Sequence, residues 1–295
     1  MRRVPTMNRS YSVPNSAGDA RPKLLAPANA CDCHMHIYDA ARFPPVRPAS
    51  RMQSDARVVE YRRLQARLGT TRTVIVNPAA SVTDNRVTLD AIAQLGANAR
   101  GIAVVHPHVT DAELRRLAAG GMRGIRFSVF DPRTAATAID MIAPLAPRVH
   151  EFGWHVQLHM RADQIVEVAD LLGGLPCPIV FDHMGRLPQP TGAQHPAFAV
   201  ICQLLEAGRA WVKLSGAYMD TKIGPPDYAD ASAVARAYIA VAPERVVWGS
   251  DWPHPTEVEK PDDAALFDLI ADWTDDDATR RRILVDNPAA LYGFE

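Results

Sequence analysis

The chain has 295 residues, a length that fits two ordinary domains or one large α/β domain. Hydrophobic residues make up 47% of the chain and charged residues 22%, values that are typical of a globular protein. The formal net charge of −1 argues against a strongly electrostatic partner, so neither nucleic acid nor an anionic membrane surface is expected to bind.

The N-terminal segment, residues 1–26, is rich in Pro, Ser, Asn and Arg and predicts a flexible tail ahead of a folded domain over residues 27–295. Arg2 and Arg3 are not followed by the apolar stretch of a signal peptide, and no apolar run is long enough to span a membrane. Four cysteines are too few for a disulfide scaffold. Together these features predict a cytoplasmic protein.

From residue 31 onward, short apolar runs alternate with longer segments of helical period. The short runs predict strands at 31–38, 73–77, 101–105, 124–129, 154–159, 178–183, 211–215 and 245–251. The longer segments predict helices at 61–68, 84–95, 111–120, 137–152, 164–172, 197–205, 231–241, 262–273 and 276–285. Pro144 and Pro147 are expected to kink or split the helix at 137–152.

Eight strands, each followed by a helix, are the element count of a single-domain α/β protein of the (β/α)₈ TIM-barrel class. A doubly wound sheet is disfavoured because no glycine-rich phosphate turn follows the first strand. Strand alternation agrees with a barrel: Ile125 and Phe127 are expected to face the helices, while Arg126 and Lys213 face inward.

The first predicted strand carries two histidines, His34 and His36, which stand two residues apart and therefore share one face. Two imidazoles on one strand can bind a metal ion or hold a polarised oxygen. Cys31 and Cys33 are expected on the opposite face of this strand, as buried apolar side chains.

Polar side chains recur where the other predicted strands end. Because the carboxyl ends of barrel strands meet at one mouth, these side chains are expected to converge there. They are His34 and His36 on the first strand, Arg126 on the fourth, His159 on the fifth, His183 and Arg186 after the sixth, Tyr218 after the seventh, and Asp251 and His254 after the eighth. Four of these histidines, His34, His36, His159 and His183, lie with Asp251 at four strand ends. Together they predict a functional site.

Several sequence runs carry a family resemblance: His34-Met35-His36, Gly124–Phe127, Phe181–Arg186, Val212–Tyr218 and Trp248–His254. On these runs the chain resembles the amidohydrolase superfamily over residues 27–293. Within the superfamily it is similar to the branch that contains 2-pyrone-4,6-dicarboxylate lactonase, 4-sulfomuconolactone hydrolase and galactarolactone isomerase. The resemblance implies a hydrolase with a TIM-barrel fold.

The resemblance also implies a metal site. In the superfamily, a histidine pair on the first strand, a histidine on the fifth and an aspartate on the eighth commonly hold one divalent metal ion. The matching residues are His34, His36, His159 and Asp251, a ligand set that suits Zn²⁺. The pyrone lactonase and the galactarolactone isomerase work without metal and lack the fifth-strand histidine, so His159 favours a metal, with metal-free catalysis as the alternative.

The expected reaction is the opening of a small carboxylated lactone. Asp251 is the expected base that activates water, and the metal or protonated His34, His36 and His183 would polarise the carbonyl group. Four further residues are expected to bind the anionic substrate: Arg126, Arg186, Tyr218 and His254. Each arginine has an alternative role in a structural salt bridge. Asp182 is expected to face the helices and to orient its neighbours.

Three other readings of the same residues stay open at this point. The barrel could serve a lactone isomerase of sugar-acid catabolism, a metal-dependent decarboxylase, or a protein that binds an anionic metabolite without reacting with it. An aspartate that faces its own anionic ligand speaks against the last reading. The sequence leaves both a monomer and a small homo-oligomer open.

Overall fold

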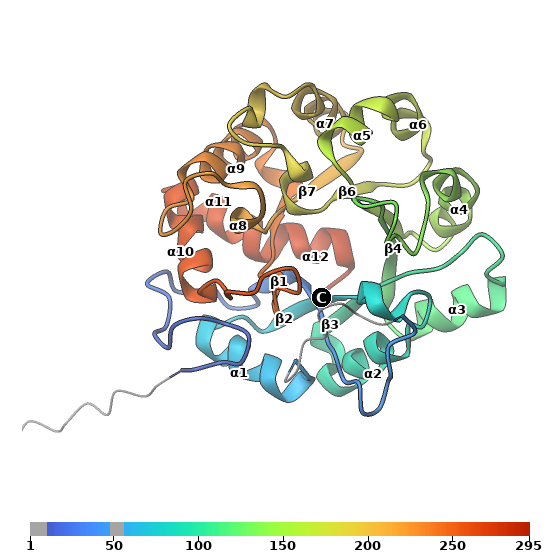
Figure 1. The fold of residues 1–295 in the computed structure, drawn as a ribbon, viewed down its shortest axis with the longest axis horizontal. Coiled ribbons are helices and arrows are strands. Elements are labelled where there is room, and N and C mark those ends of the chain that lie inside the picture. Colours follow the sequence, from blue (N-terminus) through green and yellow to red (C-terminus); the bar gives the residue numbers. More distant parts are fainter. Residues whose placement is uncertain (1–10, 48–55) are drawn as a thin grey trace, which may run out of the picture.

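The structure of the chain is a computed structural model that describes residues 11–47 and 56–295. Its centre is a ring of eight parallel strands that lie side by side in sequence order (Figure 1). The strands are β1 (Cys31–Met35), β2 (Arg72–Val76), β3 (Ala99–Ala103), β4 (Met122–Ser128), β5 (His155–His159), β6 (Ile179–Phe181), β7 (Ala210–Leu214) and β8 (Val246–Trp248). The predicted TIM barrel is confirmed.

Helices surround the ring and cover its outer face, and the last helix lies across its centre (Figure 1). They are α1 (Val58–Leu68), α2 (Arg86–Leu95), α3 (Asp111–Ala119), α4 (Ile142–His150), α5 (Ala162–Glu167), α6 (Ala169–Gly174), α7 (Pro196–Glu206), α8 (Ala217–Asp220), α9 (Ala229–Val241), α10 (Asp263–Trp273), α11 (Asp277–Arg281) and α12 (Asn287–Tyr292). Short 3₁₀ helices include η3 (Ile139–Met141) and η4 (His183–Arg186), and η7 (Arg282–Asp286) is a short π-helix. Within the two described ranges, no helix has the length and apolar character needed to cross a membrane.

Two predicted helices differ from the observed ones. The segment predicted at 137–152 begins as η3, and α4 then contains both Pro144 and Pro147 without ending at either. Pro144 lies in the first turn, where no helical N–H donor is needed. The segment predicted at 164–172 is two helices that meet at Val168.

The ring closes between β8 and β1 at the residues that carry the predicted chemistry. The Asp251 N–H donates to the His34 carbonyl at 2.7 Å, and the His36 N–H donates to the Trp252 carbonyl at 2.8 Å. Gly249 makes this approach possible, because a Cβ atom there would lie 2.7 Å from the His34 Cβ atom. The first and last strands are therefore fixed to each other by the backbone of the site itself.

An apolar cluster lies inside the barrel, below the mouth. Side chains from six strands pack there with two from the C-terminal segment: Cys31, Cys33, Val74, Val76, Ile102, Val180, Trp211, Val247, Tyr292 and Phe294. Figure 1 shows α12 and the C-terminus lying across the centre of the ring. The lower part of the barrel is thus filled, and the polar side chains of the predicted site lie above it, toward the mouth.

The expectation that Cys31 and Cys33 face away from the histidines is wrong. The pairing of β1 with β2 shifts register between Asp32 and Met35. Such a bulge lets two successive residues point to one side of a sheet. Cys33 and His34 both turn inward as a result, and strict alternation along the sequence fails at this one step.

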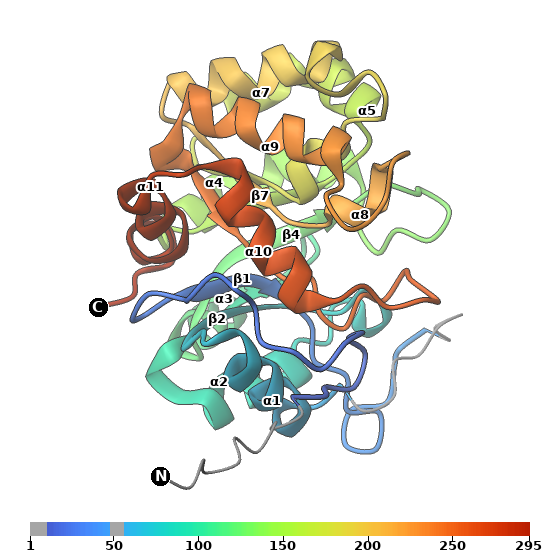
Figure 2. The ribbon, with the colours of Figure 1, turned by 90° about the vertical axis from the view of Figure 1, so that its left-hand side faces the viewer.

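Residues 11–26 pack against the barrel, so the prediction of a flexible tail does not hold for them. The indole N–H of Trp252 donates to the Pro14 carbonyl at 2.8 Å, and Arg67 of α1 donates to the Ala20 carbonyl at 2.7 Å. The segment runs between α1 and α10 (Figure 2). The prediction for the first ten residues lies outside the described residues.

We predict that Gly249→Ala destabilises the barrel. The added Cβ atom would lie within 2.8 Å of the His34 backbone nitrogen, and backbone cannot yield as a flexible side chain can. The expected loss is about 1–3 kcal/mol of unfolding free energy, measured by urea denaturation. Gly173→Ala is the control, because its Cβ would meet nothing within 4 Å. Equal stability of the two variants would contradict this account of the closure.

We also predict a pH-dependent contribution from His155, which is 2% exposed on the inner face of β5. Burial lowers the pKa of His155 to about 3. As the pH falls from about 6.5 the unfolded chain binds the proton first, so stability is lost at about 1.4 kcal/mol per pH unit. In His155→Phe this contribution should disappear from unfolding free energies measured between pH 6.5 and 4.5. An unchanged pH slope, relative to the exposed control His150→Phe, would refute it.

Candidate active site

The carboxylate of Asp251 is the centre of the candidate site. Three imidazoles direct their Nε2 atoms at its Oδ1 atom: His34 at 3.4 Å, His36 at 3.5 Å and His183 at 3.9 Å. All four residues are buried, with at most 3% of their surface exposed. The structure therefore brings together the strand-end residues of β1, β6 and β8 that the sequence singled out.

The backbone at these strand ends turns the side chains toward one point. Asp251 has a φ of 63° and His183 a φ of 49°, both in the left-handed region that is unusual for residues other than glycine. Such conformations persist where the surrounding structure holds them, and they occur often at functional sites. Here the backbone hydrogen bond from Asp251 to His34 supplies part of that support.

A second buried carboxylate, Asp32, braces the closure from the side that faces the helices. It accepts hydrogen bonds from the Ser250 N–H at 2.9 Å, the Ser250 hydroxyl at 2.6 Å and the Tyr61 hydroxyl at 3.1 Å. Burial raises the pKa of Asp32 to about 6, although these hydrogen bonds oppose the shift. Sequence reasoning missed this residue, yet a lone charge between two cysteines in an apolar strand was a usable signal.

The protonation states at the centre follow from burial and from neighbouring charges. Burial lowers the pKa of His34 well below its usual value and lowers that of His183 to about 4, so both imidazoles are neutral near neutral pH. Burial would raise the pKa of Asp251, but the imidazoles of His183, His36 and His34 outweigh it and hold the pKa well below its usual range. An ionised carboxylate thus faces the neutral rings of His34 and His183.

The tautomer of each ring decides whether its Nε2 atom faces the carboxylate with a proton or with a lone pair. The His36 Nδ1 atom lies 2.8 Å from the Val76 carbonyl oxygen, so Nδ1 carries a proton, and in the neutral ring Nε2 keeps its lone pair. The buried His34 Nε2 atom has no hydrogen-bond partner among the described residues. Ligand atoms of His34, His36 and Asp251 lie within 4.8 Å of one another, as do those of His34, Asp182 and His183. Either group could hold a cation.

The structure does not bring His159 into either group. Its Nε2 atom accepts a hydrogen bond from Arg186 at 3.0 Å, and its Nδ1 atom lies 2.9 Å from the Ser128 hydroxyl. An arginine can only donate, so the Nε2 lone pair is occupied and unavailable to a metal. The ring stacks on Phe130 instead, with their centroids 5.2 Å apart.

Arg126 lies beside the centre and lines a pocket of about 230 Å³ together with Ser128, Phe130 and His159. Its Nε atom donates to Asp182 at 2.9 Å. The two terminal nitrogens make no hydrogen bond to any other residue in the described part of the chain. Arg126 is thus held in place from one edge and presents the other edge to the pocket.

Arg186 is engaged differently from the sequence expectation. It forms a two-pronged ion pair with Asp220, at 2.6 and 2.9 Å, and its third nitrogen donates to His159. Its guanidinium also stacks over Phe130 at 4.1 Å. Arg186 therefore has the structural salt-bridge role that the sequence left as the alternative. Of the two arginines predicted to bind a carboxylate, only Arg126 lines the pocket, and its terminal nitrogens make no hydrogen bond within the described residues.

Tyr218 and His254 form a chain that leads away from the centre. The Tyr218 hydroxyl donates to Asp251 Oδ2 at 2.6 Å, and His254 Nδ1 lies 3.0 Å from the same hydroxyl. His254 is fully buried, and its Nε2 atom lies 3.2 Å from Asp263. Both residues were expected to bind substrate; in the structure Tyr218 contacts Asp251, and His254 joins Tyr218 to Asp263, a residue that was not predicted.

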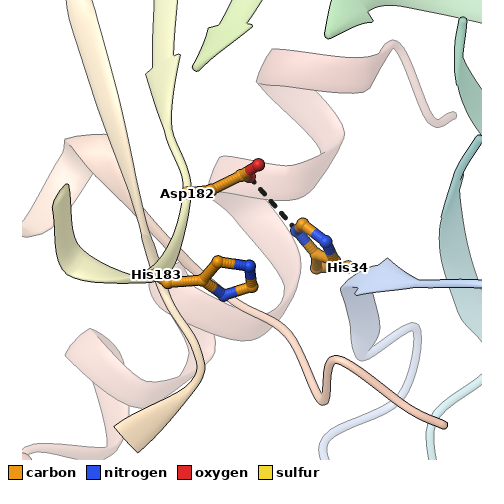
Figure 3. A group of neighbouring side chains, drawn as sticks. All are labelled: His34, Asp182 and His183. Atoms are coloured by element: carbon orange, nitrogen blue, oxygen red, sulfur yellow. Dashed lines mark ion pairs between the residues drawn. The ribbon is translucent and has the colours of Figure 1, made fainter. Parts of the chain in front are cut away.

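Asp182 points into the barrel, contrary to the expectation that it faces the helices. Figure 3 shows Asp182 and His183 reaching from the end of β6 toward His34 on β1, with the ion pair from Asp182 to His34 dashed. β6 ends at Phe181, whose ring packs toward the helices, so alternation turns Asp182 inward. The left-handed turn at His183 then sends the next side chain to the same place.

Lys213 lies beneath these residues and is fully buried. Its Nζ atom donates to Gln157 at 2.8 Å, reaches His34 Nδ1 at 3.3 Å and lies 3.6 Å from Asp182 Oδ1. The sequence predicted its inward orientation without a role. A lysine inside a barrel needs an acidic partner, and the structure supplies Asp182.

Comparisons with known proteins agree with the family resemblance. Residues 31–294 match the sequence model of the amidohydrolase family. The chain is 36% identical to a 4-sulfomuconolactone hydrolase of Rhizobium radiobacter, covering 94% of both chains. It is 33% identical to a 2-pyrone-4,6-dicarboxylate hydrolase of Comamonas testosteroni, again over 94% of both, and 31% identical to a D-galactarolactone isomerase of Agrobacterium fabrum, over 92% and 93%.

A solved structure shares the fold closely. An Agrobacterium tumefaciens protein, solved in its apo form, superposes with a TM-score of 0.86 at 30% sequence identity. The superposition covers 95% of this chain and 99% of that one. The likeness therefore extends over the whole barrel and its mouth.

Proposed function

The chain belongs to the amidohydrolase family, and on that premise we propose that it is a hydrolase that opens a small carboxylated lactone. The observation that carries the proposal is the ionised Asp251 carboxylate, which is held among imidazoles next to a pocket lined by Arg126. Two of the relatives are named as hydrolases of anionic lactones, which is the substrate class this pairing suits.

Asp251 serves as the base in this proposal. Its Oδ1 atom takes a proton from a water molecule while the water oxygen attacks the lactone carbonyl carbon. The bond from that carbon to the ring oxygen then breaks, and Asp251 returns the proton to the departing oxygen. Tyr218 keeps the carboxylate oriented throughout, because burial and the Asp251 charge hold the pKa of the tyrosine well above its usual value and its hydroxyl protonated.

Arg126 binds the substrate carboxylate in this proposal. Its terminal nitrogens can form the planar, two-pronged contact that a carboxylate accepts. Asp182 fixes the guanidinium from behind, so little conformational entropy is lost when the substrate binds. The contact would place the lactone ring between Arg126 and the Asp251 centre.

His34, His36 and Asp251 fit one divalent metal ion. The fit rests on the Nε2 atoms of His36 and His34, which are both directed at one carboxylate oxygen. The Nδ1 atom of His36 holds its proton toward Val76, and the buried His34 Nε2 atom has no hydrogen-bond partner among the described residues. Two histidines and a carboxylate form a known catalytic Zn²⁺ set that leaves a position open. When bound, the metal would polarise the lactone carbonyl and stabilise the negative charge that develops on its oxygen. The low pKa values of His34 and His183 disfavour the protonated imidazoles that metal-free catalysis would require.

A lactone isomerase is the second candidate, favoured by the relative named as a galactarolactone isomerase. The same carboxylate and arginine could bind its substrate. The two reactions differ in their mass balance, since hydrolysis adds one water to the product and isomerisation adds none.

We predict that wild-type protein converts at least one lactone from a carboxylated panel to a product heavier by one water, as read by mass spectrometry. Asp251→Asn should lower kcat by about 100-fold or more, because its amide cannot accept the proton. Asp140→Asn makes the same chemical change at an exposed position and should match wild type. Undiminished turnover by Asp251→Asn would remove Asp251 as the base, and a product of unchanged mass would favour the isomerase.

We predict that protein purified without chelator carries about one divalent metal ion per chain, measured by elemental analysis. Chelation should lower lactone hydrolysis, and re-addition of Zn²⁺ should restore it. His36→Asn should lose most of the metal, whereas the exposed control His150→Asn should keep it. Full hydrolysis by a preparation that contains no stoichiometric metal would contradict this prediction.

A further inference from the structure

A buried polar layer lies directly beneath the Asp251 centre. Asp182 accepts from the Arg126 Nε atom at 2.9 Å and from the Gln157 amide at 3.2 Å through its Oδ2 atom. Lys213 donates to Gln157 at 2.8 Å. His34 is the one member of the centre that reaches down into this layer, through its Nδ1 atom.

Two groups of opposite character compete for the His34 Nδ1 atom. The Asp182 Oδ1 atom lies 3.2 Å away and can only accept a proton, while the Lys213 Nζ atom lies 3.3 Å away and donates. One ring nitrogen cannot serve both. His36 faces no such choice, because its Nδ1 atom has a single backbone carbonyl as partner.

Whichever group pairs with Nδ1 determines whether the opposite ring nitrogen, Nε2, carries a proton. If Lys213 donates to Nδ1, the ring proton sits on Nε2 and points at Asp251 Oδ1, 3.4 Å away. If Nδ1–H donates to Asp182 instead, Nε2 is bare and can bind a cation. The imidazole is neutral in both arrangements, so they differ in tautomer and not in charge.

Two orphaned atoms indicate what the second arrangement would satisfy. His34 Nε2 and Asp182 Oδ1 are both buried without a hydrogen-bond partner among the described side chains. A proton on Nδ1 would supply Asp182 Oδ1 with a donor, and a cation would supply Nε2 with a partner. Moving the ring proton to Nδ1 therefore gives both atoms a partner only when a metal is present.

We propose that Lys213 and Asp182 act as a tautomer selector for His34: Lys213 holds the imidazole in a state that cannot bind metal, and Asp182 captures the state that can. The inference rests on the metal centre of the proposed function. When a metal binds, the Nε2 proton leaves to solvent and Nδ1 takes one up, so the net proton count is unchanged. Both residues are positioning residues, because they act through His34.

The direct test is the ¹⁵N NMR signal of the His34 ring in metal-free protein, assigned by its loss in His34→Asn. A protonated and a bare ring nitrogen differ in ¹⁵N shift. Wild type should show the proton on Nε2 and move it to Nδ1 when Zn²⁺ is added. Lys213→Met, which removes the competing donor at similar volume, should show it on Nδ1 without Zn²⁺. Lys222→Met, at an exposed position, should behave as wild type.

Metal affinity gives a second readout, measured by competition with a chelator of known affinity. Lys213→Met should bind Zn²⁺ about tenfold more tightly or better, the scale on which groups behind a ligand change affinity. Asp182→Asn should bind more weakly and keep the Nε2 proton at Zn²⁺ concentrations that shift wild type. The Asp182→Asn variant also keeps the proposal testable if Lys213→Met does not fold.

The same tautomer in metal-free wild type and in Lys213→Met would overturn the selector, as would a wild-type tautomer that Zn²⁺ does not move. Neither measurement uses a lactone. A chain that shows the tautomer shift and hydrolyses no lactone would therefore refute the proposed function and leave the selector standing. Turnover without any shift would do the reverse.

Discussion

An ionised carboxylate buried among imidazoles is the constraint on which this barrel depends. Removing a charge from water is costly unless charged or polar partners replace the lost hydration. Asp251 keeps one oxygen on the Tyr218 hydroxyl and directs the other at three ring nitrogens. The closure of β8 on β1 and the left-handed residues at the strand ends hold the carboxylate and these rings together.

The charges around the centre also explain why an anionic substrate and a cation suit the same site. Asp251 and Asp182 carry negative charge, and Arg126 and Lys213 carry positive charge, so these four side chains balance one another. A divalent cation alone would upset that balance, as would an anionic lactone alone. Bound together they compensate each other at short range, where the buried surroundings screen charge weakly.

Most of the fold could be predicted from the sequence, because eight apolar runs alternating with helical periods admit few architectures. The inward orientation of Arg126 and Lys213 followed from alternation and agrees with the contacts of both side chains. The inward orientation of Cys33 could not be predicted, because the bulge in β1 depends on the pairing with β2 and leaves no local signal in the sequence. The packing of residues 11–26 escaped prediction for a similar reason: its anchors, Trp252 and Arg67, lie far away in sequence.

The site divides in the same way. His34, His36, His183 and Asp251 could be found because strand ends of a barrel converge wherever the loops go. The partners of long side chains could not be predicted. Whether Arg186 contacts substrate, Asp220 or His159 depends on loop geometry, which residue spacing does not encode. His159 was expected among the metal ligands by family pattern, and the structure shows its lone pair engaged by that same arginine.

The most direct measurement is a crystal structure of Asp251→Asn with a carboxylated lactone that the wild type hydrolyses. We expect the intact lactone in the pocket, with its carboxylate on the terminal nitrogens of Arg126 and its carbonyl group beside the imidazoles of His34 and His36. A carboxylate bound to Arg186 with Asp220 displaced, or a carbonyl group remote from residue 251, would contradict this expectation.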